Sequence, residues 1–245
     1  MSSLISSRIT DLPIAVGIIK RSLPPMFFLS RRMCLINSSK PIDSGAINGK
    51  SNSTDGNTPQ WNWLPFPIHR DVAIEEALAF YQPTDGDVIK DQFNFAIYDA
   101  SSGWSGTLNY LQSGKGYMLS ASETQSFNYP DVNVQQKVVD GSKTAQKSNT
   151  DNNSFVQYSG NMNIVAEVIA DEDYKKVLVF DSNNVLRGTG NIIYLNNKKI
   201  SFITAFSNIS ETLKFVLAND SDQLDINKKF VFKDNLVLGN LKNPV

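Results

Sequence analysis

Four aromatic residues are the side chains of this sequence best suited to bind a ligand. Trp61, Trp63 and Trp104 are its only tryptophans, and Tyr98 lies in an alternating run shortly before Trp104. Exposed on one surface, such rings could stack on sugars and form a carbohydrate platform. The competing interpretation is burial, because a domain of about 70 residues buries only about 60% of its unfolded surface and needs its largest apolar side chains inside. We favour core packing for most of the tryptophans.

Four aspartates are weak candidates for calcium ligands. Asp85 and Asp87 lie in the stretch TDGD, and Asp171 and Asp173 flank Glu172 in a second acidic turn. Carboxylate oxygens suit calcium, but the spacing and the closing glutamate of an EF-hand loop are missing. Turn formation explains both groups better, so we predict no metal site.

No pattern for catalysis is recognisable. His69 is the only histidine, which removes multi-histidine metal sites and leaves no triad, and Cys34 is the only cysteine, which removes disulfides and cysteine zinc sites. Carboxylates such as Asp99 and Glu123 could serve a hydrolase, but nothing in the sequence sets the separation that paired carboxylates need. We therefore predict that the chain is not an enzyme and uses no cofactor.

Charge and hydropathy exclude two kinds of partner. The 245 residues carry a net charge of -1, and their basic residues form no stripe, so we expect no binding to nucleic acid. The apolar run at 12–19 is interrupted by Pro13 and is too short to span a bilayer, and its flanks fit a signal peptide poorly.

The elements that position these residues are mostly strands. Residues 1–60 read as a poorly ordered lead-in and linker, because 38–60 are nearly all Ser, Asn, Gly, Asp and other polar residues. Residues 61–130 contain short alternating runs separated by turns, which predicts a small antiparallel β module. One short helix is expected over 72–81, with Asp71 as its cap.

The remaining chain predicts a second β domain. Residues 131–154 are polar and read as an interdomain linker, and 155–245 contain seven alternating runs separated by turns, a spacing typical of a β-sandwich. The runs lie at 162–169, 175–180, 191–195, 200–206, 212–218, 229–233 and 236–238. In this domain Arg187 is expected to pair with Asp181 across a turn.

Several motifs resemble a repeated module of secreted and surface proteins of Bacteroidota. They are WNWLPFP from Trp61, TDGDVIKDQFNFAIYD, GWSGTLNYLQSGKGYML and the closing FNYP, and together they cover nearly all of 61–129. Residues 155–245 resemble a second module of the same proteins. The matching positions are Asn161, Met162, Phe180, Asp181, Arg187, Gly188, Phe215, Gly239, Leu241 and Pro244.

The resemblance implies a location more than a mechanism. It places the chain outside the cell or on its surface, in the context of type IX secretion, as noncatalytic modules for binding, adhesion or spacing, with a glycan or another surface protein as partner. A carbohydrate-binding accessory module of a hydrolase is the alternative. A further hypothesis is that the chain is a fragment of a larger secreted protein.

Overall fold

Strands make up most of the structure, as the sequence predicts. The computed structural model describes residues 42–49, 60–130 and 155–245, so the expected linker at 131–154 and most of the expected lead-in, Cys34 included, lie outside the described residues. The amino-terminal module (42–49 and 60–130) contains β1 (Ile42–Ile47), β2 (Asn62–Pro65), β3 (Val72–Ala73), α1 (Ile74–Ala77), β4 (Val88–Lys90), β5 (Phe95–Asp99), β6 (Gly103–Gly106), β7 (Tyr110–Leu111), β8 (Gly116–Ser120) and β9 (Gln125–Tyr129). The carboxy-terminal module (155–245) contains β10 (Gly160–Glu167), β11 (Lys176–Phe180), β12 (Leu186–Leu195), β13 (Lys198–Ser207), β14 (Thr212–Ala218), β15 (Gln223–Val231) and β16 (Val237–Leu238).

The main sheet of the amino-terminal module, here the first sheet, has the strand order β2-β8-β4-β5-β6 and antiparallel pairs. Alternate residues of a strand point to opposite faces, so each strand gives one set of side chains to the module's own core. That core includes Leu64, Ile89, Ala96, Tyr117 and Leu119, all buried. The other face is directed at the carboxy-terminal module.

Two local expectations for the amino-terminal module need correction. The helix is shorter than 72–81: Val72 and Ala73 form β3, and α1 ends at Ala77. Asp71 does not cap it, because Oδ1 accepts a hydrogen bond from the Ser113 N–H instead. In addition, the expected lead-in contains β1, which pairs antiparallel with β9 and ends at the buried Ile47.

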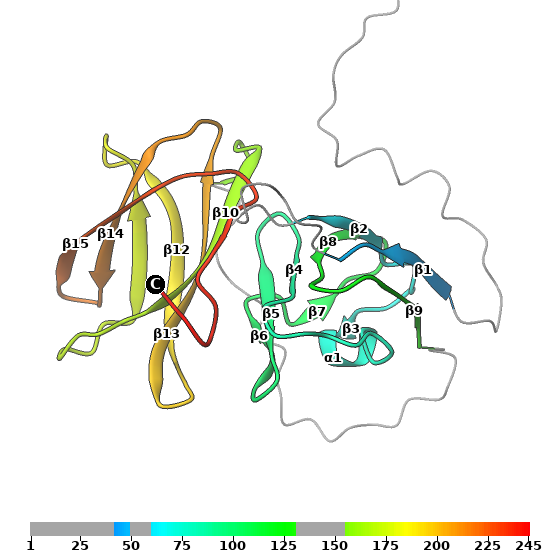
Figure 1. Ribbon diagram of the computed structural model, residues 1–245. Coiled ribbons are helices and arrows are strands. Elements are labelled where there is room, and N and C mark those ends of the chain that lie inside the picture. Colours follow the sequence, from blue (N-terminus) through cyan, green and yellow to red (C-terminus); the bar gives the residue numbers. More distant parts are fainter. Residues whose placement is uncertain (1–41, 50–59, 131–154) are drawn as a thin grey trace, which may run out of the picture.

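The strands of the carboxy-terminal module form the second sheet, in the order β15-β14-β11-β12-β13-β10-β16. All pairs are antiparallel except β10 with β16. The sheet curls around its own core, which includes Met162, Ile164, Ile203, Leu213 and Phe215 (Figure 1). Its edges are the mostly exposed β15 and the two-residue β16.

The two sheets pack against each other through a shared apolar cluster, here the junction cluster. Val88, Phe95 and Ile97 come from the first sheet, and Val165, Ile200 and Phe202 from the second, and each of the six is at most 3% exposed. The rings of Phe95 and Phe202 meet edge to face with centroids 5.9 Å apart. Figure 1 shows β4 and β5 lying beside β10 at this contact.

No helix in the described part of the chain is long and apolar enough to cross a membrane.

Candidate functional site: the junction of the two modules

Lys90 occupies the middle of the junction between the modules. It is the last residue of β4 and pairs with Phe95 of β5 and Met118 of β8. Cross-strand partners share a face of a sheet, so the lysine points in the same direction as Phe95, toward the second sheet. Its exposed fraction is 0%.

The Lys90 ammonium is held by neutral groups. Nζ donates to Asn161 Oδ1 at 2.7 Å and to Asn235 Oδ1 at 2.8 Å, and it lies 4.4 Å from the ring centre of Trp61. Burying a charged amine without an ion-pair partner costs several kcal/mol, and the cation–π contact and two amide oxygens offset only part of that cost. Burial lowers the pKa of Lys90 to about 8, with the nearby Asp234 carboxylate opposing the change.

Asn235 is fixed in place by contacts on every polar atom. Its N–H donates to Asn161 O at 2.7 Å, and its carbonyl accepts from Trp61 Nε1 at 3.3 Å. Its Nδ2 donates to Asp234 Oδ2 at 3.0 Å, while Oδ1 faces Lys90. The backbone has φ of 60°, a left-handed conformation that asparagine tolerates better than most residues.

Asn161 reaches from β10 to both modules. Its N–H donates to Asp234 Oδ1 at 2.9 Å and its Nδ2 to Gln92 O at 3.0 Å. An exposed ion pair between Lys242 and Asp85 makes a second polar link between the modules. The junction thus combines the apolar cluster with a polar centre built from three segments.

The four predicted ligand-binding aromatics do not form one platform. Trp61 and Trp63 lie on the junction face of the first sheet, since Trp63 pairs with Met118, the partner of Lys90. Tyr98 and Trp104 pair with each other on the opposite face, with ring centres 5.4 Å apart. The three tryptophans also differ in their surroundings. Trp61 packs against the junction cluster and Trp104 against the core of the amino-terminal module, whereas Trp63 is 49% exposed.

Two of the four aspartates considered as calcium ligands, Asp85 and Asp87, are engaged in contacts within the fold. Asp87 is buried and accepts from the Tyr81 hydroxyl, the Thr84 N–H and the Ser122 N–H. Asp85 accepts from the Ala100 N–H and pairs with Lys242. Asp171 and Asp173 are exposed between β10 and β11. The described residues contain no group of three His, Cys, Asp or Glu side chains that could hold a metal ion.

The residues considered for catalysis differ in their environments. Asp99 Oδ1 accepts from both the hydroxyl and the N–H of Ser101, and these bonds lower the pKa of Asp99, which keeps it ionised rather than ready to donate a proton. Glu123 and His69 are exposed.

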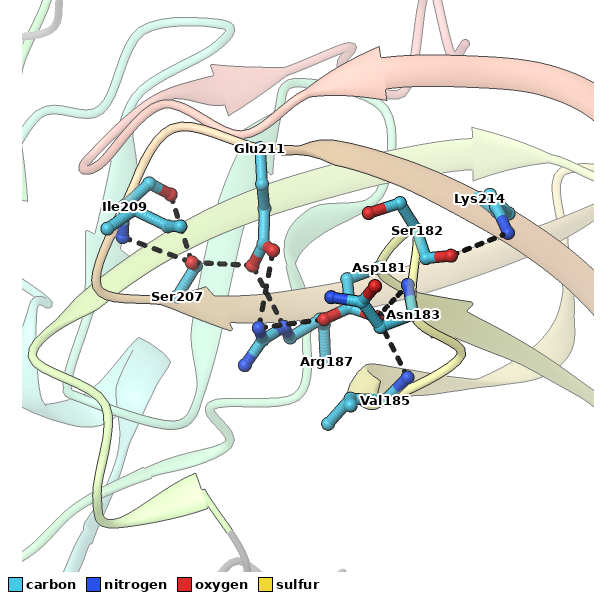
Figure 2. A network of polar contacts seen from close by, with 9 residues as sticks. All are labelled: Asp181, Ser182, Asn183, Val185, Arg187, Ser207, Ile209, Glu211 and Lys214. Atoms are coloured by element: carbon cyan, nitrogen blue, oxygen red, sulfur yellow. Dashed lines mark hydrogen bonds and ion pairs between the residues drawn. The ribbon is translucent and has the colours of Figure 1, made fainter.

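A second polar network lies inside the carboxy-terminal module (Figure 2). Arg187 Nη2 lies 2.9 Å from Asp181 Oδ2, and Arg187 Nε lies 2.8 Å from Glu211 Oε1. The Ser207 hydroxyl lies 2.6 Å from the same Glu211 oxygen. The predicted pairing of Arg187 with Asp181 is therefore confirmed.

This network connects two turns rather than forming a reactive centre. Burial disfavours the charge on Asp181, but the N–H groups of Val185 and Asn183, together with Arg187, hold its pKa below the ordinary value. The Arg187 guanidinium also lies over the Tyr158 ring, 4.9 Å from its centre. Each charged group is committed to a partner, so the network ties the β11–β12 turn to the β13–β14 connection.

Comparisons with known proteins add no relative. No family model matches the chain, and neither the curated proteins nor the solved structures contain a match.

Lys90 and its partners were not identified from the sequence. The one available signal was that Lys90 follows Val88 by two residues on a predicted strand, so the two side chains share a face of that strand. Its partners Asn161 and Asn235 are 71 and 145 residues away, so no local pattern connects them.

Proposed function

We propose that this chain is a noncatalytic pair of β modules of an extracellular or cell-surface protein, used for binding, adhesion or spacing. The observation that carries the proposal is the junction cluster. Modules joined only by a linker usually meet through small polar surfaces and move relative to each other. Here the side chains of the contact are buried as completely as those of each core, which favours one fixed orientation.

The polar groups of the described residues support the same proposal. The buried aspartates 87, 99 and 181 accept hydrogen bonds from nearby backbone or side-chain donors, and Arg187 is paired with two carboxylates. Such groups stabilise turns and connections. A unit of this kind would separate or orient binding surfaces in a longer surface protein.

Small-angle X-ray scattering of the full chain tests the rigid arrangement. The wild type is expected to show one narrow distribution of distances for the two modules, and Phe202→Asp, which puts a charge opposite Phe95, should broaden it. Ile169→Asp is the matched control, because Ile169 is 92% exposed. A wild-type distribution as broad as that of Phe202→Asp would contradict a spacer role. Antibody labelling of intact source cells and of their medium tests the location.

Carbohydrate binding is the second candidate, favoured by the exposure of Trp63. A half-exposed tryptophan on a rigid sheet can stack on a sugar ring. In glycan-array measurements, Trp63→Ala should abolish binding. Trp104→Ala should lower binding only as far as it destabilises the fold, because Trp104 packs against the core of the amino-terminal module. A folded wild-type protein that binds no glycan would rule this candidate out.

A further inference from the structure

The surroundings of Lys90 place a nucleophile against an electrophile. Nζ of the buried Lys90 lies 2.8 Å from Asn235 Oδ1. The carbon bonded to this oxygen, Asn235 Cγ, is an amide carbonyl carbon and therefore an electrophile. A buried ammonium held by neutral oxygens is costly, and the neutral amine, which fits this environment better, is a nucleophile. Asn161 Oδ1 accepts a second hydrogen bond from Nζ and so restricts its position.

We propose that Lys90 and Asn235 form a covalent amide bond that joins the two modules. The Nζ lone pair of the neutral amine attacks Asn235 Cγ and forms the Nζ–Cγ bond. The Cγ–Nδ2 bond then breaks, and its electron pair leaves with Nδ2 as ammonia. Of the two amine protons, one stays on the new secondary amide and the other goes to the departing nitrogen, so the reaction is a transamidation that needs no oxidant or cofactor.

Asp234 is placed to carry that proton. Its Oδ2 lies 3.0 Å from Asn235 Nδ2, the atom that must be protonated before it leaves. Asp234 is exposed, so ammonia released beside it has a path to solvent. Asn161 offers no equivalent route, because its Nδ2 donates to the Gln92 carbonyl, which cannot supply a proton. The geometry therefore favours Asn235 as the electrophile and Asn161 as a positioning residue.

Intact-mass spectrometry of the full chain, followed by peptide mapping, tests the proposal. The expected mass is lower than that of the sequence by one ammonia, and proteolysis should yield one branched peptide containing Lys90 and Asn235. Cyclisation of an asparagine onto its own backbone also releases ammonia but leaves the two peptides unlinked, so the branched peptide is the decisive product.

Variants separate the roles of the residues. Lys90→Met and Asn235→Ala should each abolish the branched peptide, and Lys115→Met, which changes an exposed lysine, should retain it. During refolding, Asp234→Ala should slow bond formation by roughly 10²-fold or more, the usual loss on removal of a general acid–base group. Circular dichroism confirms that each variant is folded.

Three results would overturn the proposal. The first is a folded wild-type protein that keeps the mass of its sequence after prolonged incubation at pH 9. The second is a branched peptide that contains Asn161 in place of Asn235. The third is an unchanged rate of bond formation in folded Asp234→Ala, which would remove the assigned proton carrier.

Discussion

Lys90 is a residue through which the free energy of folding should respond to alkaline pH. In the variant Asn235→Ala, residue 235 cannot form the proposed bond with Lys90, so the Lys90 amine stays free. Burial still lowers the pKa of this amine from 10.5 toward about 8. The nearby Asp234 carboxylate acts on this amine in the opposite direction and raises its pKa. Between the two pKa values the folded chain binds fewer protons than the unfolded chain, so stability rises with pH.

Relative to the double variant that also carries Lys90→Met, the free energy of unfolding of Asn235→Ala should therefore increase from pH 8 to pH 10.5, by at most about 3 kcal/mol. The double variant with Lys90→Met lacks the titrating amine and supplies the baseline. Urea unfolding at several pH values gives the difference between the two proteins. A difference that stays constant or falls over this range would show that the lysine is not buried as a destabilised cation.

Arg187 is the second residue whose removal should be costly. Arg187→Ala leaves two mostly buried carboxylates, Asp181 and Glu211, without their cation, and losing one partner of a buried ion pair costs about 3–5 kcal/mol. Lys175→Ala is the matched control, because it breaks an exposed pair with Asp220 and should cost far less. Equal losses of unfolding free energy in the two variants, measured by urea unfolding, would show that burying the Arg187 network does not increase its contribution to stability.

At the scale of single strands, β12 depends on a bulge and a glycine. The register of β11 with β12 shifts between Val179 and Phe180, which pair with Gly188 and Leu186, so Arg187 is the extra residue of the bulge. Gly188 then passes close to β13, where an added Cβ would lie 2.3 Å from Thr204 O. A bulge changes the direction of a side chain, and this one brings Arg187 to its two carboxylates.

Gly188→Ala should therefore destabilise the chain by about 1–3 kcal/mol, the usual cost of forcing an extra carbon into a packed site. Gly116→Ala is the control, since nothing lies within 4 Å of its added Cβ. Thermal unfolding of both variants measures the contrast. Similar losses at the two positions would mean that β12 and β13 can separate without cost.

The strands could be predicted from the sequence more accurately than the helix or the candidate site. All seven runs expected in 155–245 correspond to observed strands, and 212–218 coincides with β14, because alternation with turn residues is a local signal. The helical spacing of Ile74, Ala77, Leu78 and Tyr81 predicts a longer helix than α1, because Val72 and Ala73 pair with β7 instead and α1 ends at Ala77. The junction could not be predicted, since Lys90 meets its partners only after two sheets dock.

At the scale of the whole molecule, the two modules should unfold together. All three tryptophans lie in the amino-terminal module, so tryptophan fluorescence reports on that module, whereas far-UV circular dichroism reports on both. Because the junction cluster is part of both packed units, the two signals should have coincident midpoints in the wild type. Phe202→Asp should separate them. Two distinct midpoints in the wild type would show that the modules fold independently.

The edges of the second sheet affect how the molecule meets copies of itself. A strand edge with free backbone groups is a template on which another chain can continue the sheet. β15 carries Asp225, Lys228 and Lys229, all exposed, and its register with β14 is broken between Lys214 and Phe215. β16 offers only two residues at the opposite edge. Growth into fibrils by strand addition is thus resisted at both edges of the second sheet.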